Sequence, residues 1–223
     1  TLYRVARRYG VGLRTLKRLN PDLPRRLERG TEVQLPLRRR WRRRRFVHLD
    51  DSAGLRVLVP RRAWGTHLTV TRLRQTFAAY AARFPGAEPV WIHDLSRRWG
   101  GKLLAHKSHR TGRDVDIRVV LNYPETKYRC ASPRTLDLER TWFQVQQLIK
   151  TGDVQYIFFD YRLQRALYRY ARRQGVSKEE LEEIFQYPRG RRNPVGIVRH
   201  ERGHANHLHV RFRPGPLEEI PSV

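Results

Sequence analysis

The chain has 223 residues, and its 47 Lys and Arg exceed its 21 Asp and Glu by 26 charges. This length allows one ordinary domain and a small one, and the single cysteine, Cys130, excludes an internal disulfide framework. No apolar run is long enough for a transmembrane helix, and the positive charge favours an anionic partner such as nucleic acid, anionic lipid or a cell-wall polymer.

The first 36 residues are predicted to form a compact unit of two short helices and a strand. Helical spacing of apolar residues predicts one helix that ends at Gly10 and another over residues 13–19. Residues 32–36 follow a turn and are predicted to form a strand. The unit resembles a LysM domain, the small βααβ module that binds N-acetylglucosamine-containing glycans, at residues 1–6, 9–11, 19–21 and 33–36. The resemblance implies a truncated module, because the family's first strand would precede Thr1.

Residues 37–46 are an arginine-rich run that we predict to be a solvated, self-repelling linker. The alternative is a patch that docks on an anionic polymer or on nucleic acid. The predicted domains are therefore residues 1–36, the linker 37–46, and a larger domain over residues 47–223.

The larger domain is predicted to be of the α+β class with a mostly antiparallel sheet, because its helices and strands mix without strict βαβ alternation. Residues 64–66 are predicted as a turn, and a capping box at Ser177 is predicted to open a short helix. Strands are expected at residues 55–60, 90–93, 114–121 and 154–160 and at a final strand through 207–212. Longer helices are expected up to about residue 84 and over residues 136–151 and 161–173.

Two histidine-rich segments, residues 106–116 and 204–209, hold five of the nine histidines. Each segment leads into an alternating strand, and alternation places Asp116 on one polar face and His207 and His209 on another. If the two strands are neighbours, they can offer imidazole and carboxylate groups to one point. The sequence therefore predicts a zinc hydrolase whose Zn²⁺ ligands are His109, Asp116 and His209.

The remaining histidines are candidates for the chemistry around such an ion, which leaves one coordination position for a nucleophilic water. His207 shares a strand face with His209, so it is the candidate base that takes the proton of the water. His204 is a second catalytic candidate, for the substrate or the transition-state oxyanion, and His106 lines the site or adds a ligand. Glu201 paired with His204 is a weaker alternative for the base.

Some of these acidic residues also have a purely structural interpretation. Asp114 and Asp116 could simply pair with Arg113 and Arg118.

The two segments resemble the penicillin-insensitive murein endopeptidases, zinc peptidases of the wider LAS group. The resemblance covers roughly residues 50–213, and its motifs are the histidine-rich segments 106–116 and 204–211, with Asp94-Leu95-Ser96 and Gly100-Gly101 upstream. It implies an LAS-type peptidase domain in which His109, Asp116 and His209 bind zinc. It also implies that His207 acts as the base or stabilises the transition state and that His106 and His204 line the site. Members cleave D-alanyl–meso-diaminopimelate cross-links between peptidoglycan stems.

The two resemblances together imply a hydrolase tethered to wall glycan in the periplasm, the cell envelope or the secreted fraction. Arg118 and Arg211 lie on the site faces of their strands and are candidates for gripping a stem carboxylate; the alternative is that they pair with Asp114 or other acids. Other possible functions are a D,D-carboxypeptidase, an L,D cross-link peptidase, and a non-catalytic wall-binding module with structural zinc. Specific nucleic-acid binding is the weakest hypothesis, since no known motif accompanies the charge.

Overall fold

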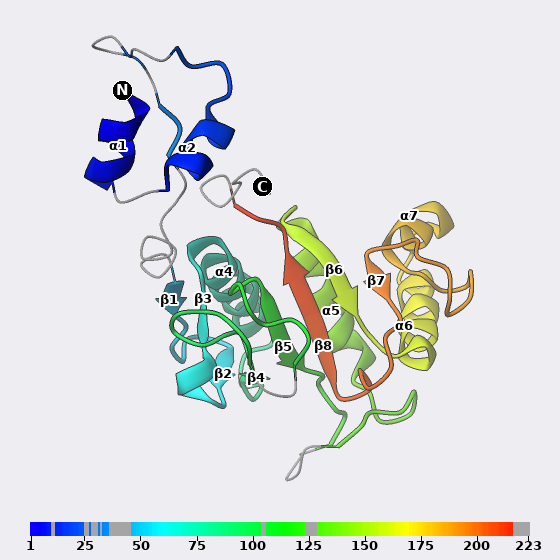
Figure 1. The fold of residues 1–223 in the computed structure, drawn as a ribbon. Helices are drawn as coiled ribbons and strands as arrows, with labels where there is room; N and C mark the ends of the chain where they lie inside the picture. The colour runs from blue at the N-terminus through cyan, green and yellow to red at the C-terminus, as the bar shows by residue number, and fades with distance from the viewer. Residues whose placement is uncertain are drawn as a thin grey trace. The chain divides into compact units, whose positions relative to one another are not determined.

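The computed structural model describes residues 1–9, 12–24, 27, 31, 33–35, 46–103, 106–123 and 129–215. The chain divides into two compact units, Thr1–Arg44 and Arg45–Val223, which are treated separately below (Figure 1). Of the predicted linker 37–46, only Phe46 lies within the described residues.

The first unit contains the two expected helices, α1 (Leu2–Tyr9) and α2 (Leu13–Leu19). The strand expected at residues 32–36 is not formed in its described part, 33–35. Instead, the side-chain amide of Asn20 donates to the carbonyl of Gln34 at 2.8 Å, and its oxygen accepts from the Gln34 N–H at 2.7 Å. A side chain thus satisfies the backbone groups that a partner strand would otherwise bind.

The second unit is built on a six-stranded sheet with the order β2-β4-β5-β8-β6-β7. The four central strands pair antiparallel, and the edge strands β2 and β7 run parallel to their neighbours. The expectation of an α+β fold with a mostly antiparallel sheet is met. The strands are β2 (Leu55–Val57), β4 (Val90–Ile92), β5 (Asp114–Arg118), β8 (His207–Phe212), β6 (Val154–Phe158) and β7 (Val198–Arg199).

A separate two-stranded ladder joins β1 (Phe46–His48) to β3 (Trp64–Thr66). The prediction of a turn at residues 64–66 is therefore wrong. Gly65 pairs with Val47 across this ladder, and a partner so distant in the chain is invisible to a local pattern. A short 3-10 helix, η1 (Pro60–Arg62), connects the sheet to this ladder.

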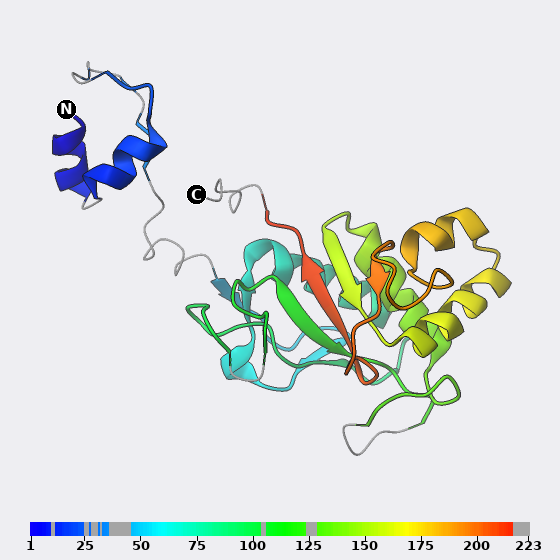
Figure 2. The same cartoon turned by 45° about the vertical axis from the view of Figure 1, so that its right-hand side comes forward.

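Four helices complete the second unit: α4 (His67–Arg83), α5 (Leu138–Lys150), α6 (Tyr161–Arg173) and α7 (Lys178–Ile184). Each begins at a side chain that accepts a hydrogen bond from the first turn, namely Thr66, Asp137, Asp160 and Ser177. Figures 1 and 2 show α4 and α5 packed on one side of the sheet, behind β5 and β8. No helix within the described residues combines the length and hydropathy that a membrane crossing requires.

The strands β5 and β8 bury one face completely. Val115 and Ile117 of β5 and Leu208 and Val210 of β8 are 0% exposed and belong to the hydrophobic core. Because successive side chains alternate, the intervening residues of both strands must share the opposite face. The core thereby fixes which side of the sheet carries Asp116.

Replacing Ile117 by alanine should lower the free energy of unfolding by about 2–5 kcal/mol, because it leaves a cavity in the central strand. Denaturant unfolding followed by tryptophan fluorescence measures this. Val195→Ala is the control, since Val195 is 47% exposed and its truncation should change stability by less than about 0.5 kcal/mol. Equal effects of the two substitutions would contradict the assignment of this face to the core.

Candidate metal centre

The antiparallel pairing of β5 with β8 brings the two histidine-rich segments together. In this register Asp116 is opposite His209, and Arg118 is opposite His207. Paired residues in neighbouring strands project to the same side of a sheet. The adjacency that alternation alone could only suggest is therefore present, with the Asp116 carboxylate and the His209 imidazole side by side.

A tight loop delivers His109 to the same point. The loop ends at Gly112, whose φ is +69° and whose carbonyl accepts from the Thr66 N–H at 2.9 Å. A Cβ on Gly112 would lie 3.0 Å from the Thr66 nitrogen, so only glycine lets the loop pack against β3. His109 itself has φ +56°, a strained conformation for a non-glycine residue, and its side chain is 0% exposed.

Three donor atoms converge in this arrangement. Nε2 of His109 is 3.3 Å from Oδ1 of Asp116 and 3.2 Å from Nδ1 of His209. The Nδ1 atom of His209 is 2.9 Å from Oδ1 of Asp116. A tetrahedral zinc ion with its usual bond lengths separates its ligand atoms by about 3.3 Å. The triangle of His109, Asp116 and His209 is therefore close to the size that one such ion requires.

The protonation pattern of the two imidazoles leaves lone pairs pointing at this centre. Nδ1 of His109 donates to the Leu95 carbonyl at 2.9 Å, so Nε2 carries no proton in the neutral ring. Nε2 of His209 lies 3.1 Å from Oδ1 of Asp114 and holds the proton there, which leaves Nδ1 bare. Oδ1 of Asp116 is buried and accepts no aligned hydrogen bond. When both rings are in these neutral forms, three lone pairs face one another, and a proton or a metal ion between them relieves their repulsion.

The charged groups around the three donor atoms favour a cation between them. Burial lowers the pKa of His209, but the carboxylates of Asp114 and Asp116 outweigh burial and raise this pKa to about 9. Burial raises the pKa of Asp116, but the neighbouring His109 and His209 outweigh burial and hold this pKa far below its ordinary value of 3.8. The site therefore accepts a cation readily, and its two imidazoles and one carboxylate are a donor set suited to zinc.

A second layer of polar groups orients the candidate ligands. Asp114 accepts from the Arg211 Nε at 2.7 Å while it faces His209. A carboxylate or carbonyl behind a metal-binding imidazole fixes its tautomer and ring orientation, and the Leu95 carbonyl does the same for His109. For Arg211 the structure thus favours the alternative, pairing with Asp114. Asp114 and the Leu95 carbonyl orient the two candidate imidazole ligands. The sequence singled out only Asp114, because it lies two residues before Asp116 on the same strand face.

The other histidines surround this centre. Nε2 of His207 is 3.6 Å from Oδ1 of Asp116, while its Nδ1 is 2.7 Å from Oδ1 of Asn206. Nδ1 of His204 donates to the Arg202 carbonyl at 3.1 Å. Burial lowers the pKa of His207 to about 4 and also lowers that of His204, so both rings are neutral near pH 7. His204, His207 and His209 are also close enough to form an alternative ligand group.

His106 lies on the other side of Asp116. Its Nδ1 is 3.8 Å from Oδ2 of Asp116, and its Nε2 is 2.9 Å from Oδ2 of Asp94. Asp94 also accepts from the Arg62 Nη1 at 3.0 Å. The contact to Asp94 was missed in the sequence, because only the fold brings residues 94 and 106 together.

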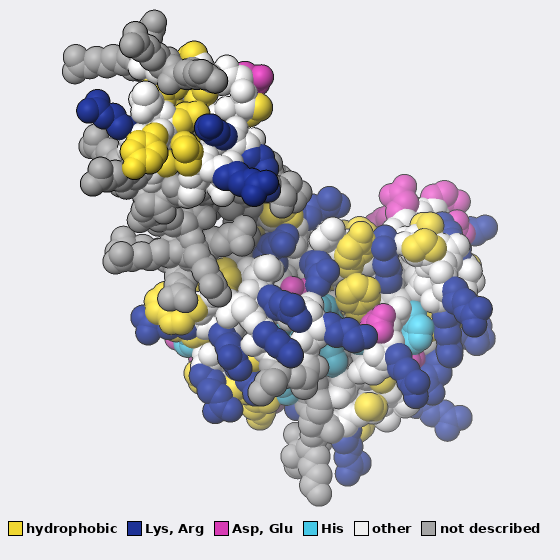
Figure 3. Space-filling model, viewed as in Figure 1, with side chains coloured by type: hydrophobic (Ala, Val, Ile, Leu, Met, Phe, Trp, Pro, Cys, Tyr) yellow, Lys and Arg dark blue, Asp and Glu magenta, His cyan; other side chains and the backbone are white. Residues whose placement is uncertain are grey.

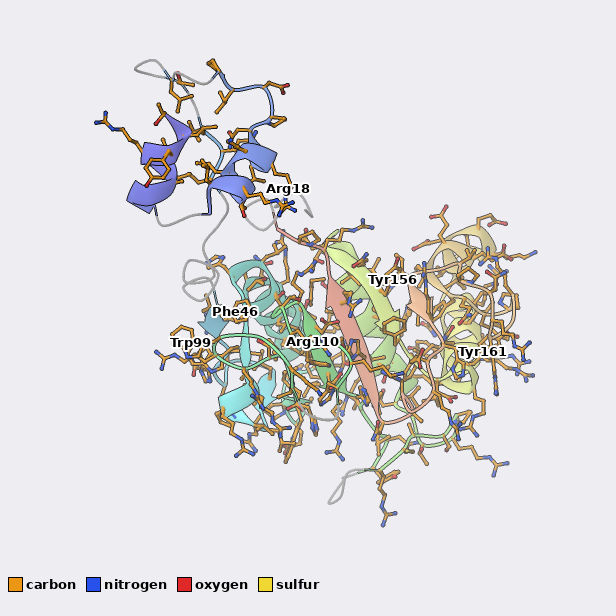
Figure 4. All side chains as sticks on the ribbon, in the orientation of Figure 1. Arg18, Phe46, Trp99, Arg110, Tyr156 and Tyr161 are labelled. Atoms are coloured by element: carbon orange, nitrogen blue, oxygen red, sulfur yellow. The ribbon has the colours of Figure 1, made fainter. Side chains whose placement is uncertain are left out.

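The remaining sequence candidates lie at the edge of the site. The Arg118 guanidinium lies 5.8 Å from the ring centroid of Trp91, and Glu201 is exposed in the loop before β8. Figure 3 shows histidine side chains at the centre of this face, surrounded by Lys and Arg. Figure 4 places Arg110, from the His109 loop, over β5.

A family model described as penicillin-insensitive murein endopeptidase matches residues 53–218, a span that contains every residue of the candidate metal centre. No curated protein matches the chain.

Substitutions of the candidate ligand Asp116 and of the supporting carboxylate Asp114 should lower the affinity for Zn²⁺ to different extents. Asp114→Asn should weaken Zn²⁺ binding about 10- to 100-fold, because it removes the carboxylate behind His209. Asp116→Asn should weaken binding more, because it removes a candidate ligand. Calorimetric titration of metal-free protein with Zn²⁺ measures both. Asp153→Asn is the matched control, since Asp153 pairs with Arg72 outside this cluster. Unchanged affinity in Asp116→Asn would rule out this centre.

Proposed function

Because the chain belongs to the penicillin-insensitive murein endopeptidase family, a family of metallopeptidases, we propose that it cleaves peptide cross-links in peptidoglycan with one zinc ion held by His109, Asp116 and His209. The convergence of three lone pairs on one buried point carries this proposal. Such a centre can activate water for peptide hydrolysis without a Ser or Cys nucleophile.

When bound, the ion would lower the pKa of a coordinated water toward neutrality and polarise the scissile carbonyl. His207 supplies the base. Its Nδ1–H donates to Asn206, so Nε2 is unprotonated and lies beside the candidate ligand Asp116. This nitrogen takes the proton of the attacking water and then passes it to the leaving amine.

His204 lies next to the base, with ring centroids 4.7 Å apart. Its Nδ1–H is held by the Arg202 carbonyl, so Nε2 of the neutral ring is unprotonated and accepts a hydrogen bond from a substrate N–H. Burial lowers the pKa of His204, and the nearby Asp116 carboxylate acts in the opposite direction. His106, held by Asp94, lies near the other carboxylate oxygen of Asp116.

The family implies a peptidoglycan substrate and activity in the cell envelope. We propose the D-alanyl–meso-diaminopimelate bond as the scissile bond, with a periplasmic or secreted location. The net charge of +26 supports this substrate, because the stem peptides carry carboxylates. A D,D-carboxypeptidase or an L,D cross-link peptidase would use the same ligands, so the products decide among them.

Residues 1–36 are proposed to be a LysM-like module that tethers the enzyme to wall glycan. The support is the pair of helices α1 and α2 with the sequence motifs around them. Tethering would raise the effective concentration of an insoluble polymer at the metal centre.

Digestion of purified cross-linked muropeptide dimers tests the reaction. The zinc-loaded protein should convert dimers to monomers, and a chelator should abolish this. His207→Ala should lower kcat about 10²- to 10⁴-fold while bound zinc stays stoichiometric, because it removes the base but no ligand. His67→Ala, an exposed histidine at the start of α4, is the control. Release of free D-alanine without loss of dimers would instead assign a D,D-carboxypeptidase.

Removal of residues 1–44 tests the tether. The shortened chain, which begins at the second compact unit, should cleave soluble dimers at the full rate. On insoluble sacculi its rate should fall by about 10²-fold, because the intramolecular advantage is lost. Cosedimentation with sacculi and release of soluble fragments measure the two effects. Undiminished binding and cleavage of sacculi would refute the tether and leave the peptidase assignment intact.

A further inference from the structure

One row of paired residues crosses four strands on the face of the metal centre. Asp116 is opposite His209, His209 is opposite Phe158, and Phe158 is opposite Arg199. All four side chains therefore project to the same side of the sheet. Neighbouring strands are about 4.8 Å apart, so the backbone of Arg199 lies about 10 Å from that of His209.

Aromatic side chains of β6 fill the space between the metal centre and Arg199. The Phe158 ring lies 5.6 Å from the His209 ring and 6.1 Å from those of His204 and Tyr156. Phe158 and Tyr156 are only partly buried. Figure 4 shows Tyr156 on β6 next to β8, and Figure 3 shows a hydrophobic patch over β6 beside the central histidines. The metal centre thus borders an apolar shelf.

Arg199 is held rigidly at the far end of this shelf. Its guanidinium carbon lies 4.0 Å from the Tyr156 ring centroid, and its Nε donates to the Gly196 carbonyl at 2.7 Å. Gly196 packs closely on the backbone of Gln186, where a Cβ would lie 2.7 Å from the nitrogen. The next residue, Ile197, donates its N–H to the Ile184 carbonyl at 2.9 Å. Arg199 forms no ion pair with any acid in the described part of the chain. Its two terminal nitrogens therefore present a fixed fork.

We propose that Tyr156, Phe158 and Arg199 form a substrate subsite for a carboxylate carried on an aliphatic side chain. The shelf packs the aliphatic part, and the guanidinium fork binds the carboxylate through two parallel hydrogen bonds. Arg211, the sequence candidate for this role, already donates to Asp114. The proposal rests on the proposed function for the identity of the substrate, since peptidoglycan stems carry such side chains.

Binding and turnover together test the subsite. On a His207→Ala background, which should hold substrate without cleaving it, calorimetry measures the Kd of a cross-linked muropeptide dimer. Arg199→Gln should raise this Kd about 10- to 100-fold, and Arg199→Lys should raise it less, because lysine keeps the charge but not the fork. Arg191→Gln is the matched control, since Arg191 lies over Tyr161 outside the row and should leave Kd unchanged.

A dimer whose carboxylates have been converted to amides provides the decisive comparison. It should bind the parent protein as weakly as the unmodified dimer binds Arg199→Gln, and Arg199→Gln should have no further effect on it. In the active enzyme, Arg199→Gln should raise KM with kcat within about twofold. Equal Kd for Arg199 and Arg199→Gln, or the same loss on both dimers, would overturn the subsite. Arg199-dependent binding without cleavage by the zinc-loaded parent would refute the peptidase assignment and keep the subsite.

Discussion

The antiparallel register between β5 and β8 is the constraint on which the functional face depends. A slip of β8 by one residue against β5 would turn His209 into the core and expose Leu208, while Asp116 stayed on the functional face. The completely buried apolar residues on the other face oppose such a slip. The hydrophobic effect therefore aligns the metal centre, although none of the residues that supply it takes part in the chemistry.

Buried carboxylate oxygens on the polar face destabilise the folded state. Asp116 is buried with an oxygen that has no aligned hydrogen bond, and Asp94 has another such oxygen. A buried polar atom without a partner usually costs about 1–3 kcal/mol. A metal ion bound at the convergence point would remove this cost at Asp116, so metal binding would stabilise the second unit. The carboxylates of Asp114 and Asp116 that raise the pKa of His209 to about 9 favour a proton at this point when no metal is bound.

Features set by local pattern were predictable from the sequence, and features set by distant contacts were not. The helix α6 has the predicted bounds, and Ser177 caps α7 as the capping box indicates. The alternation in β5 and β8 predicted a polar face on each strand but not the pairing and register that join the two faces into one site. The ladder between β1 and β3 was missed because its pairing depends on residues 18 apart in the chain, Val47 and Gly65.

In the candidate site, too, some residues could be predicted from the sequence and others could not. His109, Asp116 and His209 stood out in the sequence because imidazole and carboxylate groups cluster in strand-leading motifs. The backbone carbonyl of Leu95 has no sequence signature, and Arg199 is one arginine among many. The sequence left open whether Arg211 grips substrate, and its contact with Asp114 depends on the cross-strand pairing of these two residues.

The row from Asp116 to Arg199 is set by backbone hydrogen bonds, so its spacing cannot adjust to a ligand as a flexible side chain can. Positions along this row are therefore separated by multiples of the inter-strand distance of about 4.8 Å. If Arg199 forms the proposed subsite, a ligand would be selected by the distance between its two anchored groups, with little dependence on the chemistry between them. A relative that selects a ligand of a different length would have to carry its anchoring residue on a different strand. Mutations in the surrounding loops would leave the distance between the two anchors unchanged.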